Sequence, residues 1–134
     1  MFVGEIKAWC EAARSEAKDM SLSAPFHPED YEFLLAKMEK LAQENEVNFY
    51  LEKSLLTTDL FADVDMTDRW VFIIFKKEHI IEKYLDLKTE KENLEAHGKY
   101  VGRSREEIAR KMGKLLGYSD SYTMQLLLMM TKGR

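Results

Sequence analysis

The stretch RWVFIIFKK, at residues 69–77, constrains the fold more than any other part of the chain. Its central residues, 70–75, are all apolar, so a strand formed here has no polar face to turn toward water. The run is also rich in aromatic and β-branched residues, which are favoured in strands. We therefore predict the most buried strand of the protein at residues 69–76.

The other predicted strands are shorter and less buried. In residues 47–53, Val47, Phe49 and Leu51 alternate with more polar neighbours, which is the pattern of a half-buried strand. The pattern of residues 60–64 is ambiguous between a short strand ended by an acidic turn and a loop. These segments predict a small sheet of two or three strands, which we expect to be antiparallel.

Most of the remaining chain has apolar residues at helical spacing. Two prolines, Pro25 and Pro28, separate the first two helical segments, because each disfavours helix at the preceding residue. The helices are expected at residues 3–20, 29–45, 78–95, 104–116 and 119–131. Together with the sheet they predict a mostly helical α+β fold, in a single domain of 134 residues.

The ends of the last two helices carry recognisable signals. Ser104 and Glu107 have the spacing of a capping box, in which the serine caps the helix and the glutamate reaches back. Gly117 suits a left-handed stop. Ser119 is placed to cap the final helix. Residues 104–130 are therefore expected to form two helices joined by a short turn.

Charge and cysteine content narrow the possible partners and compartments. The chain has 24 acidic and 20 basic residues and a net charge of −4, which does not favour nucleic acid as a partner. Cys10 is the only cysteine, which excludes an internal disulfide and suits a reducing compartment. The longest apolar runs fall far short of the roughly 20 residues needed to span a membrane. We expect a cytoplasmic protein with no membrane association and no cofactor.

The carboxyl-terminal run LLLMM, at residues 126–130, is apolar on too many sides for one small core to cover. Methionine adapts to irregular partner surfaces, and the chain has eight of them. We therefore predict an interaction or regulatory module that forms a homo-oligomer, or binds another protein, through this helix. The predicted contact residues are Tyr122, Leu126, Leu127, Leu128, Met129 and Met130.

A first alternative is a DNA-binding regulator that resembles a helix-turn-helix over residues 104–130. Ala109 and Gly113 have the spacing that lets the two helices of such a module cross closely. The second helix, however, offers Thr123 and Gln125 and then only apolar residues, whereas a recognition helix presents polar and basic side chains. Close packing of the two helices is therefore the preferred interpretation. If DNA is bound, the cations available are Arg103, Arg105, Arg110, Lys111 and Lys114.

A second alternative is a metal-binding protein or a small enzyme. Asp63, Asp65 and Asp68, with Asp59 nearby, could offer oxygen ligands to Mg²⁺ or Ca²⁺, although a solvated acidic turn explains them more simply. An acid–base pair could be formed by His79 with Glu52 or Glu78. That pattern is too general to assign any catalytic residue.

The sequence LLGYSDSY, at residues 115–122, resembles the Leu-Leu-Gly-Tyr-Pro-x-Cys-Cys signature of an uncharacterised family of small prokaryotic proteins. Ser119 stands where the signature has proline, and Ser121 and Tyr122 stand where it has the two cysteines. Any thiol or metal chemistry of those cysteines is absent from this chain. The resemblance therefore implies a prokaryotic origin and assigns no site residue.

Overall fold

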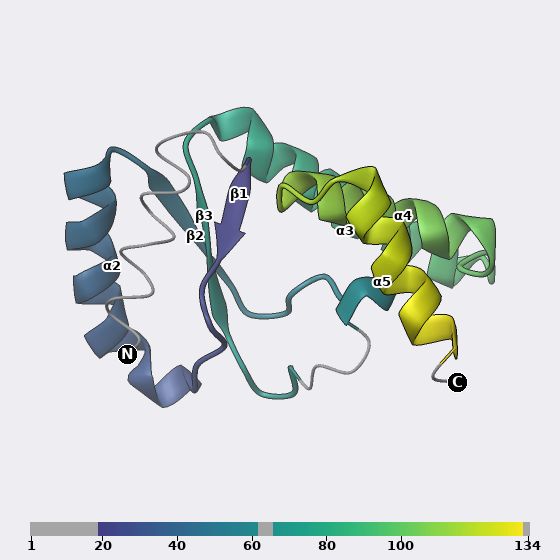
Figure 1. The fold of residues 1–134 in the computed structure, drawn as a ribbon. Helices are drawn as coiled ribbons and strands as arrows, with labels where there is room; N and C mark the ends of the chain where they lie inside the picture. Colours follow the sequence, from purple (N-terminus) through teal and green to yellow (C-terminus); the bar gives the residue numbers. More distant parts are fainter. Residues whose placement is uncertain (1–18, 62–65, 133–134) are drawn as a thin grey trace. The chain divides into compact units, whose positions relative to one another are not determined.

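The computed structural model of this chain describes residues 19–61 and 66–132, without the side chains of Phe61 and of residues 129–132. Within these ranges it contains four α-helices, two short 3-10 helices and a three-stranded antiparallel sheet (Figure 1). The predicted mostly helical α+β fold with a small antiparallel sheet is confirmed.

The chain, predicted as a single domain, divides by its internal contacts into two compact units. Of the described residues, 19–55 and 66–81 belong to unit 1, and 56–61 and 82–132 belong to unit 2. Each unit has an apolar cluster of its own among the described residues.

The sheet of unit 1 is built around β3 (Val71–Phe75), with β1 (Met20–Leu22) and β2 (Asn48–Glu52) on either side. Both outer strands pair with β3 in antiparallel register. All five residues of β3 are buried, so neither of its faces meets water. The apolar run that predicted the most buried strand does form it.

One face of this sheet is covered by α2 (Tyr31–Asn45), which follows a 3-10 turn, η1 (Pro28–Asp30). Leu34 and Met38 of the helix share an apolar cluster with Phe72 and Ile74, which lie on the same face of β3. The helix ends at Glu46, whose φ of 56° is left-handed and turns the chain toward β2.

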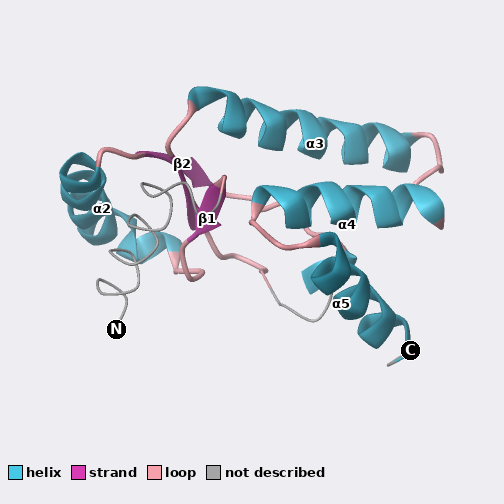
Figure 2. Ribbon diagram, turned by 45° about the horizontal axis from the view of Figure 1, so that its top comes forward, coloured by secondary structure: helices cyan, strands magenta, loops and turns pink. Residues whose placement is uncertain are grey.

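Unit 2 is helical. A 3-10 turn, η2 (Asp59–Phe61), is accompanied by α3 (Glu78–Ala96), α4 (Arg103–Leu115) and α5 (Asp120–Lys132). The first turn of α3 belongs to unit 1, and the rest of the helix belongs to unit 2. In Figure 2, α3 and α4 lie side by side and α5 follows α4 after a short turn. Leu60 of η2 packs with Ala109 of α4 and Leu127 of α5 in the core.

Two predicted elements need correction. The helix expected at residues 3–20 lies outside the described residues up to 18, and Met20 belongs to a strand, where it pairs with Phe75. The strand expected at 60–64 is wrong at its start, because η2 occupies residues 59–61. The N–H of Leu60 donates to the Thr58 side chain, a local bond that favours a turn over an extended strand. Residues 62–64 lie outside the described residues.

The signals at the ends of the last helices were partly correct. Gly117 has a left-handed φ of 83°, and the Ser119 hydroxyl accepts a hydrogen bond from the N–H of Tyr122, so both predicted roles are confirmed. The capping box is wrong, since α4 begins at Arg103 and its N-cap is Gly102, with no side-chain bond. The φ of 51° at Gly102 is one that glycine adopts more readily than serine.

Candidate interaction surface

The inward face of α5 is held in the core of unit 2. Thr123 and Leu127 lie one turn apart and are only 1% and 9% exposed. Leu127 packs with Leu60 and Ala109, which come from two other elements of the unit. These contacts fix which side of the helix faces inward.

The approach of α4 to α5 depends on Gly113. A Cβ atom at this position would lie 2.7 Å from the Thr123 Oγ1 and 3.3 Å from the Leu60 Cδ1. Since Thr123 is buried and β-branched, its side chain has little freedom to move away. The prediction that a small residue here permits close packing of the two helices agrees with this geometry.

The outward face of α5 carries exposed residues without charge. Tyr122 is 48% exposed and Leu128 is 57% exposed, and Gln125, also exposed, lies between them in sequence. The three residues are three positions apart, so they form one inclined ridge on the helix surface. We call Tyr122, Gln125 and Leu128 the α5 stripe.

The first residue of the stripe rests against a neighbouring aromatic ring. The rings of Tyr118 and Tyr122 meet edge to face, with centroids 5.2 Å apart and planes at 86°. Burial, followed by the interaction with Tyr122, raises the pKa of the Tyr118 phenol above its ordinary value. This contact restrains the Tyr122 ring while leaving about half of it accessible.

The six predicted contact residues do not share one surface. Tyr122 and Leu128 lie on the outward face, whereas Leu126 is half-buried at the margin of the core. Leu127 is buried in the core, so its prediction as a surface contact is corrected. The reason is the helical period, which turns successive residues by about 100° and directs adjacent leucines to different faces. The side chains of Met129 and Met130 lie outside what the structure describes.

The cations proposed for DNA binding are largely engaged with carboxylates. Arg105 donates two hydrogen bonds to Asp59, at 2.6 and 3.2 Å. The other pairs join Arg103 to Glu107 at 3.9 Å, Arg110 to Glu106 at 3.4 Å and Lys111 to Glu90 at 3.1 Å. A surface whose positive charges are already paired has less to offer to phosphates.

A polar cluster around Tyr100 was not foreseen from the sequence. The Arg105 guanidinium lies 5.0 Å from the centre of the Tyr100 ring, and the Lys91 ammonium lies 5.1 Å from it. Lys91 also donates to the backbone oxygen of Thr57 at 2.7 Å. The hydrogen bond to Asp59 raises the pKa of Arg105, while burial and then the Asp59 charge raise that of the Tyr100 phenol.

This cluster joins residues 57–59 to α3 and α4 through hydrogen bonds and cation–π contacts. Its polar partners are matched to one another, so we interpret it as a structural anchor. No sequence signal could have found it, because Asp59 and Arg105 are 46 positions apart.

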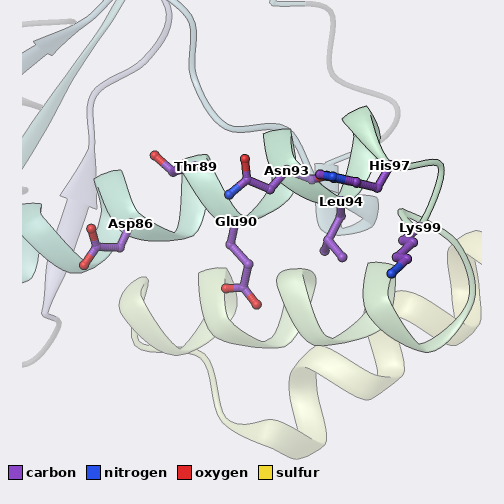
Figure 3. Close-up of a pocket in the computed structure, with 7 residues that line it drawn as sticks. All are labelled: Asp86, Thr89, Glu90, Asn93, Leu94, His97 and Lys99. Atoms are coloured by element: carbon purple, nitrogen blue, oxygen red, sulfur yellow. The ribbon is translucent and has the colours of Figure 1, made fainter.

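Residues of α3, together with Lys99, line a shallow hollow of about 460 Å³, and Figure 3 shows these residues as sticks. Glu90 and Leu94 point toward α4 in this view, and Glu90 accepts hydrogen bonds from Lys111. His97 uses Nδ1 to bond the backbone oxygen of Asn93, at 2.8 Å. Among the residues that the structure describes, no group of three or more His, Cys, Asp or Glu could hold a metal ion.

The predicted metal and acid–base residues do not form a site in the described part of the chain. Asp63 and Asp65 lie outside the described residues, and Asp68 is exposed, with a left-handed φ of 56°. Glu52 is buried opposite Val71, at the start of β3, and accepts a hydrogen bond from the N–H of Ser54.

The acid–base pairing of Glu52 with His79 is corrected by the register of the sheet. Glu78 and His79 are exposed and follow the far end of β3, whereas Glu52 lies beside its first residue. The pair is separated by the length of the strand. Glu78 and His79 are neighbours in the first turn of α3, where both side chains face solvent.

Comparison of this chain with protein-family models, with curated proteins and with solved structures found no match. Within residues 19–61 and 66–132, none of the helices combines the length and the apolar character needed to cross a membrane.

Proposed function

We propose that this protein is a cytoplasmic interaction module that self-associates through the α5 stripe. The observation that carries the proposal is that the exposed side chains of α5 that the structure describes, at residues 121–128, are all uncharged. After Asp120, the exposed side chains described on this helix are Ser121, Tyr122, Gln125 and Leu128. Depletion of charge, with aromatic residues present, is typical of the buried centre of protein interfaces.

A neighbouring helix supports this interpretation, because α4 has a different outward composition. Its exposed residues are Arg103, Glu107, Arg110, Lys111 and Lys114. All of them are charged, so α4 has the surface of a helix that stays in water. The contrast indicates that α5 is the helix whose outward face gains from being covered.

A second copy is the partner that the chemistry of the stripe favours. The stripe combines an aromatic ring, an amide and an aliphatic side chain. Each of these groups can pair with a group in the stripe of a second copy. An aromatic ring packs well on an aliphatic chain, and an amide both donates and accepts hydrogen bonds. A strongly charged partner would find no opposite charge on these three residues.

Sedimentation velocity over a wide concentration range tests the proposal. We expect the wild-type chain to show concentration-dependent association and Leu128→Asp to remain monomeric, because the new carboxylate would have to be desolvated without a partner. Val101→Asp is the matched control, since Val101 is 64% exposed and lies outside α5. This control should associate like wild type.

Circular dichroism should show that both variants keep the helical content of the parent chain. A wild-type protein that stays monomeric at the highest attainable concentration contradicts the proposal. Equal loss of association in the two variants would place the interface elsewhere or indicate a general effect of charge.

A further inference from the structure

We infer that Met124 is a site of oxidation to methionine sulfoxide, and that Arg110 directs the incoming oxygen to one of the two lone pairs of its sulfur. The oxidant is a peroxide. Two observations support this site, namely the exposure of the described methionines and the contact between these two side chains. The site is independent of the proposed self-association.

The methionine side chains that the structure describes differ in their access to solvent. Met20, Met38 and Met112 are 0% exposed, so a peroxide can reach their sulfurs only when the fold opens. Met66 and Met124 are half-buried. Of the described methionines, these two are therefore the ones that a peroxide can reach in the folded chain.

The sulfur of Met124 has a charged donor beside it. Arg110 of α4 donates from Nη2 to the Met124 Sδ of α5, at 3.1 Å. Glu106 holds the same guanidinium through Nε, at 3.4 Å. A guanidinium keeps its proton at any ordinary pH, so the donor beside the sulfur is permanent.

This contact distinguishes the two lone pairs of the thioether. One of them accepts the N–H of Arg110, whereas the other is free to attack a peroxide. Because a methionine sulfoxide is chiral at sulfur, reaction at a single lone pair gives a single epimer. Arg110 is thus a positioning residue, whose effect is read in the stereochemistry of the product.

The reaction with hydrogen peroxide is balanced without any further reactant. The free lone pair of sulfur forms the S–O bond while the O–O bond breaks. The departing hydroxide takes the proton of the transferred oxygen and leaves as water, so sulfur loses two electrons and the peroxide gains two. The product has a polar oxygen where Met124 packs against Leu60, Ala109 and Leu127, and we expect this oxygen to weaken that apolar contact.

Peroxide treatment of the full chain, followed by proteolysis and tandem mass spectrometry, measures oxidation at each methionine separately. Met112 is the internal reference, because it lies in the same unit and is fully buried. We expect oxidation at Met124 to be at least about tenfold faster than at Met112, since only the latter requires opening of the fold. Equal rates at the two residues would show that Met124 also reacts only after unfolding, and would overturn the site.

Two stereospecific reductases, one for each sulfoxide epimer, then determine the stereochemistry at Met124 in the digest. We expect one of them to reduce at least about four-fifths of this sulfoxide. Arg110→Leu should bring the two epimers close to equal amounts. Lys114→Leu, which removes an exposed charge from the same helix, should keep the excess of one epimer. Slow oxidation of Met112 in each variant shows that the variant is folded.

Two results would overturn the role of Arg110. One is a near-equal mixture of epimers in the parent chain, and the other is an excess that persists in Arg110→Leu, since shielding by the core would then explain it.

The effect on stability is tested with Met124→Leu, which shows how oxidation of the other methionines alters melting. The parent chain should lose more of its melting temperature on peroxide treatment than this variant does. Equal losses would contradict the expected weakening of the contact.

Discussion

α4 and α5 are both 13 residues long and belong to the same unit, yet they meet solvent in different ways. The exposed residues of α4 are all charged, and several of them are paired with carboxylates. The exposed residues described on α5 are uncharged after its first position. Both helices bury one face, so burial alone does not distinguish them.

The difference lies in what each helix gains from a partner. Covering the outward face of α4 would remove charges from water, at a cost that ion pairs only partly offset. Covering the outward face of α5 removes apolar surface from water, which stabilises an assembly by about 25 cal/mol per Å² before the costs of association. On this argument, α5 is the better candidate of the two helices for an interface.

The largest expected effect contrasts two adjacent leucines of α5. Leu127→Ala leaves a cavity in the core of unit 2 and should lower the free energy of unfolding by about 2–5 kcal/mol. Leu128→Ala removes an exposed side chain and should change it by less than about 0.5 kcal/mol. Urea denaturation measures both values, at a concentration where the chain is monomeric. Similar values would show that the helix is not oriented as described.

A substitution at the contact between α4 and α5 should lower the free energy of unfolding by nearly as much. Gly113→Ala places a methyl group 2.7 Å from the Thr123 Oγ1, so we expect a loss of about 1–3 kcal/mol through overpacking. Lys114→Ala, at the next position but exposed, is the control and should lie within about 0.5 kcal/mol of wild type. Thermal unfolding measures the difference, and equal melting temperatures of the two variants would contradict this contact.

Substitutions near the N-terminal caps of the two helices should change stability by a smaller amount. Ser119→Ala removes the oxygen that accepts the N–H of Tyr122 and should destabilise the protein by about 1 kcal/mol. Ser104→Ala lies inside the first turn of α4, whose cap is Gly102, and should have little effect. Chemical denaturation of the two variants side by side tests the assignment, which fails if Ser104→Ala is the more harmful.

The smallest effect is expected on the charged face of α4. Lys111→Ala breaks an ion pair with Glu90 that is largely open to water, so the loss should be about 0.2–1 kcal/mol. Screening reduces such a contribution, and the difference from wild type should shrink at high salt. The sedimentation of this variant should match that of wild type. If the variant failed to associate, the interface would have to include α4.

Several elements could be predicted because their signals are local. The fully apolar β3, the alternating β2, the left-handed turn at Gly117 and the Ser119 cap each depend on residues within a few positions of one another. Signals of this kind can be recognised in the sequence because the period of a helix or strand determines which neighbouring residues share a face.

Other features depend on partners far along the chain. Met20 extends a helical pattern in sequence but forms a strand, because it pairs with Phe75 of the central strand, β3, and a local pattern cannot reveal that distant partner. The bond between Asp59 and Arg105, and the Tyr100 ring beside it, likewise require the fold to bring distant residues together.

The sequence by itself determined that the last helix has more apolar residues than one face can hold. Only the tertiary structure decided which of them are buried, since the contacts of Leu127 and Thr123 with α4 and η2 fix the rotation of the helix about its axis. That rotation leaves Tyr122 and Leu128 in water. Composition determines how much apolar surface a chain carries, whereas packing determines where the remainder is exposed.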